Sequence, residues 1–166
     1  MADLASPQPR LTFGRLLEPL LGPATGYARA LLRNRHDAED AVQQAALRGL
    51  ERFNTFDPAR PFKAWWFSVL RNCCMDLLRD PARRREEGLG ATDLADPQEP
   101  AAAWADLAAA LDRLGPDHRE ILRLRYFGDL NYRELAEVLD VPQGTVMSRL
   151  HSARKALAAQ FAEGEP

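Results

Sequence analysis

The chain has 166 residues, of which 46% are hydrophobic and 28% are charged. This ordinary globular composition suits one medium domain or two small ones, and it excludes a collagen, a mucin-like stalk and a wholly disordered chain. Twenty-two Lys and Arg against 24 Asp and Glu give a net charge of −2. The balance excludes a strongly basic nucleic-acid coat protein, so any contact with nucleic acid must come from local patches.

The ends and the apolar runs of the sequence predict neither export nor membrane insertion. No apolar run approaches the roughly 18 to 20 residues that cross a bilayer. The first ten residues lack both the basic part and the apolar part of a signal peptide. We therefore expect a cytoplasmic protein.

Residue types that support catalysis or metal binding are few. Cys73 and Cys74 are chain neighbours with Cα atoms about 3.8 Å apart, too close for an ordinary disulfide. The three histidines are scattered, so no metal-ligand spacing is present and we expect no cofactor. A Gly-rich phosphate loop and the GxSxG and HExxH motifs are also absent from the sequence, and we expect no enzyme and no small-molecule substrate.

Hydrophobic periodicity predicts helices in the first part of the chain. Residues 11–21 form an apolar helix that Gly22 and Pro23 are expected to stop, and residues 24–32 form a second helix. In a third helix, from Asp37, apolar spacings of four, four and three predict a buried stripe made of Val42, Ala46, Leu50 and Phe53. The acidic side chains in the first turn of that helix interact favourably with the positive end of the helix dipole. The alternative is that they form a contact surface, which would need a basic partner.

The next predicted helix, residues 61–79, has two different sides. One side is expected in the core and carries Trp66, Leu70, Cys73 and Leu77. The opposite side is a polar strip made of Trp65, Ser68, Asn72, Asp76 and Arg79. Trp65 can stack on an unpaired base and Asn72 can bond to its edge, while the basic residues nearby favour a phosphate chain. The alternative is a core tryptophan beside a hydrated polar face, and the spacing alone leaves both open.

Residues 81–103 are rich in proline, glycine and charge and poor in large apolar residues. This composition predicts a flexible linker, because so long a loop within one compact domain would be unusual. We therefore expect two small helical domains, at residues 8–80 and 104–163.

The second part of the chain predicts a helix-turn-helix. A helix at residues 104–114 is followed by Asp117 and Glu120, whose spacing resembles a capping box for a helix that ends at Tyr126. A short helix at 131–139, a turn and a final helix at 143–161 then complete the motif, the last helix burying Val146, Leu150, Ala153 and Leu157.

The final helix also carries a distinctive outward face. Residues 141–160 contain Arg149, Arg154 and Lys155 and no acid. The second helix of a helix-turn-helix enters the major groove, where Arg149 can contact guanine and the other two cations can neutralise phosphates. The alternative is a solvated helix face, but the absence of acids favours DNA binding.

Four blocks of the sequence, in order, resemble one known family. They read HDAEDAVQQ at residues 36–44, PFKAWW at 61–66 with the polar strip that follows, NYRELA at 131–136 and VPQGTVMSRLH at 141–151. This pattern resembles the extracytoplasmic-function group of bacterial RNA polymerase sigma factors. The resemblance implies an all-α, two-domain initiation factor that directs core polymerase to specific promoters and is released from an anti-sigma factor on a stress or envelope signal.

The resemblance also implies roles for individual residues. Binding to the clamp helices of the largest core subunit falls to Asp37, Asp40, Gln43 and Gln44. Recognition and melting of the −10 element falls to Asn54, Phe56, Arg60, Phe62, Lys63, Trp65, Asn72, Asp76 and Arg79. Recognition of the −35 element falls to Gln143, Thr145, Met147, Ser148, Arg149, His151, Ser152, Arg154 and Lys155.

Two other functions remain open at this point. A sigma-like decoy would capture an anti-sigma factor without initiating transcription, but it would not need the DNA-facing cations. A helix-turn-helix repressor would use its first domain to sense a ligand or to dimerise, which the matching blocks at residues 36–79 argue against.

Overall fold

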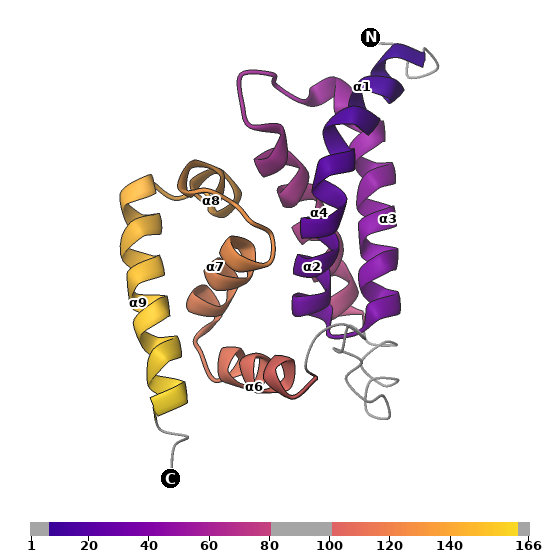
Figure 1. Cartoon of the computed structure of the whole chain (residues 1–166). Coiled ribbons are helices and arrows are strands. Elements are labelled where there is room, and N and C mark those ends of the chain that lie inside the picture. The colour runs from indigo at the N-terminus through magenta and orange to yellow at the C-terminus, as the bar shows by residue number, and fades with distance from the viewer. Residues whose placement is uncertain (1–6, 81–100, 163–166) are drawn as a thin grey trace.

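The computed structural model describes residues 7–80 and 101–162, and within these ranges every regular element is a helix. The first domain contains α1 (Pro7–Leu17), the 3-10 turn η1 (Glu18–Leu20), α2 (Leu21–Leu32), α3 (Arg35–Glu51), η2 (Phe53–Thr55) and α4 (Phe62–Arg79). The second domain contains α6 (Ala101–Asp112), α7 (Pro116–Tyr126), α8 (Tyr132–Leu139) and α9 (Gln143–Ala162). Figure 1 shows these two groups side by side, which confirms the predicted all-α, two-domain fold.

The prediction that Gly22 and Pro23 stop the first helix is wrong. The break lies earlier, at η1, and both residues belong to the first turn of α2. Proline is tolerated there because its missing N–H group would have no partner within the helix. Helix α2 is capped at its C-terminal end by Arg33, which has a left-handed backbone (φ 57°). The N–H of Arg33 donates a hydrogen bond to the carbonyl of Arg29.

Helix α3 buries Val42 as predicted, but the predicted Ala46, Leu50 and Phe53 are only partly buried and the centre of its buried stripe lies to one side of them. Asn34 caps the helix, its side chain accepting a hydrogen bond from the N–H of Asp37 at 3.0 Å. The buried positions are mostly small: Ala38, Ala41, Val42, Ala45 and Gly49. A Cβ on Gly49 would lie 3.1 Å from the ring of Phe13, so the neighbouring elements pack closely against this line. Hydrophobic periodicity weights large side chains, so it predicted the partly buried edge of this face and missed the small residues at its centre.

Helix α4 is the central element and buries two faces. Trp66, Leu70 and Cys73 are buried as predicted, but Phe67 and Cys74 are buried as well. Phe67 faces the second domain, where a Cβ built on Gly128 would come within 2.8 Å of its ring. Both cysteines are free thiols, and burial raises the pKa of Cys74 to about 12.

The predicted capping box at α7 is absent, and a different one exists. Gly115 precedes α7 without a side-chain cap, and Glu120 forms an ion pair with Arg71 instead. The capping box lies at α8, where the side chain of Asn131 accepts from the N–H of Glu134 at 2.9 Å. The Glu134 carboxylate accepts from the N–H of Asn131 at 2.8 Å in return. Glu120 pairs with a cation of the other domain instead of capping its own helix. A local motif cannot predict a pair between residues so far apart in the chain.

The two domains share one continuous hydrophobic core, in which α4 packs against α8 and α2 against α7. Residues 81–100 of the predicted linker lie outside the described residues, and residues 101–103 form the start of α6. None of the helices in the described ranges is long and apolar enough to cross a membrane.

Candidate nucleic-acid interface

Helices α8 and α9 form the predicted helix-turn-helix. Asp140 ends α8 in a left-handed conformation (φ 53°), and the chain then turns through Val141 and Pro142 into α9. Leu135 of α8 is fully buried, as are Val146 and Leu150 of α9. Since these apolar side chains lock the two helices together, the opposite face of α9 is held outward.

The outward face of α9 contains most of the predicted −35 residues. Gln143, Met147, Ser148, His151, Ser152, Arg154 and Lys155 are exposed, and Thr145 is half-buried. Arg149 differs from its neighbours, because only 25% of its side chain is exposed and its guanidinium lies 3.9 Å from the carboxylate of Asp117. These exposed side chains are open to solvent, whereas Arg149 would have to leave Asp117 to reach a base.

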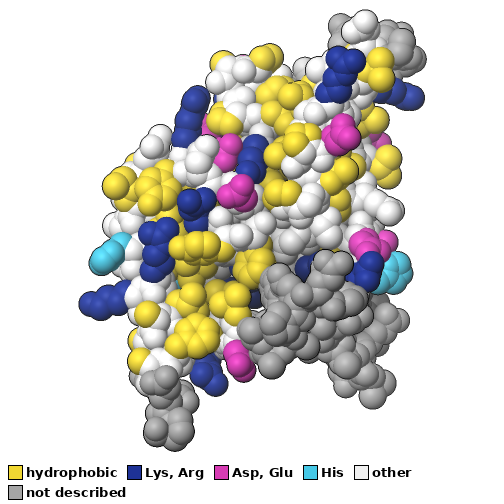
Figure 2. Space-filling view, viewed as in Figure 1, with side chains coloured by type: hydrophobic (Ala, Val, Ile, Leu, Met, Phe, Trp, Pro, Cys, Tyr) yellow, Lys and Arg dark blue, Asp and Glu magenta, His cyan; other side chains and the backbone are white. Residues whose placement is uncertain are grey.

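Arg154 is held by aromatic residues that the sequence reasoning missed. Its Nε donates a hydrogen bond to the hydroxyl of Tyr126 at 2.7 Å, and its guanidinium carbon lies 5.7 Å from the centre of that ring. The hydrogen bonds to Tyr126 and Tyr132 raise the pKa of Arg154. Figure 2 shows basic and hydrophobic side chains gathered on the side of the molecule where Figure 1 places α9. The sequence offered one signal for this contact, namely that Tyr126 and Tyr132 lie in the two segments that precede the acid-free helix.

An aromatic cluster underlies the predicted −10 surface. The rings of Phe53 and Phe56 are stacked, with centroids 5.9 Å apart and planes at 11°. Trp65 lies 5.4 Å from Phe56 and 5.6 Å from Phe62. All four rings are half-buried, so their remaining exposed faces offer a platform on which an unpaired base can stack.

The later part of the polar strip of α4 lies in solvent, whereas Trp65 and Ser68 at its start are half-buried. Asn72, Asp76 and Arg79 are exposed, and so is Asn54 in the preceding turn. Asp76 accepts a hydrogen bond from Arg48 of α3 at 2.9 Å. Asn72 therefore lies beside a carboxylate, that of Asp76, whose charge is balanced by Arg48.

Two predicted −10 cations contact the second domain, although Arg60 itself stays exposed. The Nε of Arg60 donates to the carboxylate of Glu137 in α8 at 3.0 Å, and this bond raises the pKa of Arg60. Lys63 bonds to the main-chain carbonyl of Asp129, and only 18% of its side chain is exposed. The structure thus brings a part of the −10 set against the helix-turn-helix.

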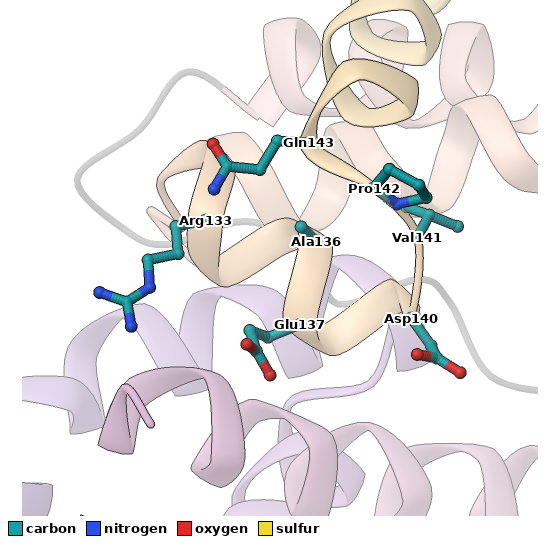
Figure 3. A pocket seen from close by; sticks show the side chains of 7 residues that line it. All are labelled: Arg133, Ala136, Glu137, Asp140, Val141, Pro142 and Gln143. Atoms are coloured by element: carbon teal, nitrogen blue, oxygen red, sulfur yellow. The ribbon is translucent and has the colours of Figure 1, made fainter. Parts of the chain in front are cut away.

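Close to this contact, a shallow polar cavity of about 380 Å³ lies between α8 and the start of α9. Figure 3 shows Arg133 and Gln143 on one side of it and Glu137 directed toward the helices of the first domain. A second cavity, of about 340 Å³, lies between the domains and includes Arg123. Burial lowers the pKa of Arg123 to about 10. Neither lining holds a nucleophile beside a base, and within the described ranges no three His, Cys, Asp or Glu side chains gather as metal ligands.

The predicted polymerase-binding residues form one face of α3. Gln43 and Gln44 are exposed, and Asp37 and Asp40 are half-buried. Leu47 is 64% exposed. Leu47 lies four residues after Gln43 and so shares its side of the helix.

Comparison with known proteins identifies the family. The sequence matches the family models of sigma-70 region 2 over residues 16–85 and sigma-70 region 4 over residues 110–159. It is 35% identical over 144 residues to the ECF RNA polymerase sigma factor SigL of Mycobacterium tuberculosis, covering 82% of this chain and 81% of that protein. The chain belongs to the extracytoplasmic-function sigma factors.

Two solved structures share its architecture. RpoE in complex with the anti-sigma factor NepR from Bartonella quintana superposes with a TM-score of 0.73, at 25% identity, over 93% of this chain and 99% of that one. CnrH in complex with the cytosolic domain of CnrY gives a TM-score of 0.72, also at 25% identity, over 94% of this chain and 91% of that one. Because each match spans both domains, the similarity extends to how the domains are arranged.

Proposed function

We propose that the two domains of this sigma factor divide promoter recognition between them. Residues 8–80 bind core polymerase and recognise and melt the −10 element, residues 104–163 recognise the −35 element, and residues 81–103 connect the two. The observation that carries this proposal is the exposed, acid-free face of α9, locked outward by Val146 and Leu150 in a region that matches sigma-70 region 4.

Within the second domain, α9 enters the major groove. Its first turn, with Gln143, lies nearest the base edges, and Ser148 and His151 offer both donors and acceptors there. Arg154 and Lys155, further along the helix, neutralise phosphates. The two tyrosines around Arg154 support this role, because they restrict its guanidinium before DNA arrives.

Within the first domain, the aromatic cluster and the α4 strip hold the melted strand. A base taken out of the stack requires an aromatic surface and a polar partner for its edge. Trp65 and Phe56 supply the surface, Asn72 is exposed one to two helical turns beyond Trp65, and Arg79 extends the cationic side of the strip. Asp76, paired with Arg48, keeps α3 and α4 in register.

The α3 face around Gln43 and Gln44 binds the clamp helices of the largest core subunit, with Asp37 and Asp40 at its start. Leu47 adds apolar area to the same face. The chain supplies no catalytic group of its own and acts in the cytoplasm as a subunit of the polymerase. An anti-sigma factor binds the chain until an inducing signal releases it, a proposal supported by the similarity to RpoE, which was solved in complex with the anti-sigma factor NepR.

Run-off transcription of fragmented genomic DNA from the source organism tests the function directly. Core polymerase is supplied with and without the chain, and the 5′ ends of the RNA are sequenced. We expect new start sites that depend on the chain and share −35 and −10 motifs. Core binding without new starts would contradict the proposed promoter-reading surfaces, and the absence of core binding would favour the decoy.

A further inference from the structure

The cavity of about 340 Å³ that includes Arg123 has the size of a small-molecule site and two chemically different sides. The apolar side is formed in part by three half-buried residues of α2 and α4, namely Leu31, Met75 and Leu78. The cationic side carries Arg33 at the end of α2 and Arg119 and Arg123 of α7. Such a lining suits a ligand with an anionic group and an apolar body.

The cationic side holds more positive charge than its carboxylates balance. Arg33, Arg119 and Arg123 all converge on the carboxylate of Asp112. Arg119 and Arg123 lie 3.8 Å and 3.7 Å from it, which is longer than a hydrogen bond. The other carboxylate of the lining, that of Glu120, is paired with Arg71. Three guanidinium groups therefore share one carboxylate, whose acceptor sites are far fewer than their N–H donors.

Arg123 is the most buried of the three arginines. Only 7% of the residue is exposed, and its Nε is buried with no hydrogen-bond partner among the described residues. Burial, followed by repulsion from Arg119, lowers the pKa of Arg123 to about 10. A buried polar group without a partner is costly. An oxyanion that accepts a hydrogen bond from this guanidinium would remove that cost and balance the charge of Arg119 as well.

We infer that this cavity binds the phosphate group of a small molecule, with Arg33, Arg119 and Arg123 as its ligands. A phosphate group has about three terminal acceptor oxygens, so it can accept from several guanidinium groups at once. The planar guanidinium also matches phosphate geometry better than an ammonium group does. The inference is independent of the proposed promoter contacts, because none of the three arginines belongs to the −10 or −35 set.

The test measures phosphate binding to the full chain. Isothermal titration calorimetry and phosphorus NMR follow two probes, inorganic phosphate and adenosine monophosphate, at constant ionic strength set with sodium chloride. Adenosine serves as a probe without phosphate. The variants are Arg123→Gln and Arg119→Gln, and the second keeps the test open if the first does not fold, because 30% of the Arg119 side chain is exposed. Arg113→Gln is the matched control, since Arg113 is exposed and lies outside the lining.

We expect at least one phosphate probe to bind saturably to the unchanged chain. Each folded cavity variant should weaken this binding about tenfold or more through loss of a charged hydrogen-bond donor, and the control should not. Tighter binding of adenosine monophosphate would support a nucleoside phosphate as the ligand, and equal binding of both probes would support free phosphate. Three results would overturn the inference: binding of neither probe, an equal affinity in Arg119→Gln, and binding of adenosine as tight as that of its monophosphate. The start sites mapped by transcription test the proposed function separately, so failure of one does not imply failure of the other.

Discussion

The two DNA surfaces of this sigma factor differ in their availability. The outward face of α9 is in solvent, and Figure 1 shows α7 and α8 lying between α9 and the helices of the first domain. The −10 surface instead meets α8 and the loop before it, where Arg60 and Lys63 find carboxylate and carbonyl partners. One domain contact therefore leaves the outward face of α9 in solvent while it pairs two cations of the proposed −10 surface.

The largest expected effect comes from removing the anchor of α9. Leu150 is fully buried, so Leu150→Ala should lower the free energy of unfolding by about 2 to 5 kcal/mol. Urea unfolding measures this change, with Leu47→Ala as an exposed control that should cost less than about 0.5 kcal/mol. Binding to −35 duplex should fall, whereas binding to fork-junction DNA carrying the −10 element should persist. Equal losses on both DNAs would show that the two surfaces are not independent.

The next effect separates base reading from phosphate contact on α9. Arg149→Ala should cost about 1 to 3 kcal/mol of affinity for the mapped −35 duplex if the side chain leaves Asp117 to contact guanine. Lys155→Ala should weaken mapped and scrambled duplexes alike and reduce the salt dependence by about one ion. Titrations of both sequences at several salt concentrations decide the matter. If Arg149→Ala weakens the two sequences equally, Arg149 is no base reader.

A smaller effect is expected at the −10 surface. Asn72→Ala removes about one hydrogen bond to an extruded base, worth roughly 0.5 to 1.5 kcal/mol. It should slow the opening of duplex promoters while leaving core binding unchanged, since Asn72 lies on α4 and the polymerase-binding face lies on α3. Permanganate footprinting measures opening, and a pre-melted template should restore transcription. Failure of that rescue would remove Asn72 from the melting site.

The smallest expected effect concerns the support that both surfaces share. Asn131→Ala removes the capping box of α8 and should cost about 1 kcal/mol of stability in urea unfolding. Asn131→Asp keeps a capping oxygen and serves as the control. Because α8 carries Glu137 and also anchors α9, the Ala variant should weaken −35 binding and loosen the domain contact together. A stability loss without either change would mean that the start of α8 affects neither surface.

Much of the architecture was predictable because it depends on local rules. The exposure of Asn72, Asp76 and Arg79 on α4 follows from periodicity, and the turn before α9 follows from a proline that cannot continue a helix. Local rules failed where a contact with a distant part of the chain was more favourable than the local one. Glu120 has capping spacing and yet pairs with Arg71, and α3 packs on Ala41 and Ala45 because close helix approach needs small side chains.

The candidate site likewise contains features that follow from local sequence and features that depend on distant contacts. The exposed residues of α9 were predictable, because a helix anchored by Val146 and Leu150 has only one free face. The hydrogen bond between Tyr126 and Arg154 and the position of the largely covered Arg149 beside Asp117 were not predictable, since each joins residues 28 or more positions apart in the chain.

The sequence by itself determined the helices, the helix-turn-helix, the acid-free face of α9 and the family, because periodicity, turn residues and motif order are local properties. Only the tertiary structure decided that α4 buries a second face and that Lys63 and Arg60 meet the second domain. These contacts depend on how two separately encoded domains pack, and packing is set by the shape and charge of surfaces that are far apart in the sequence.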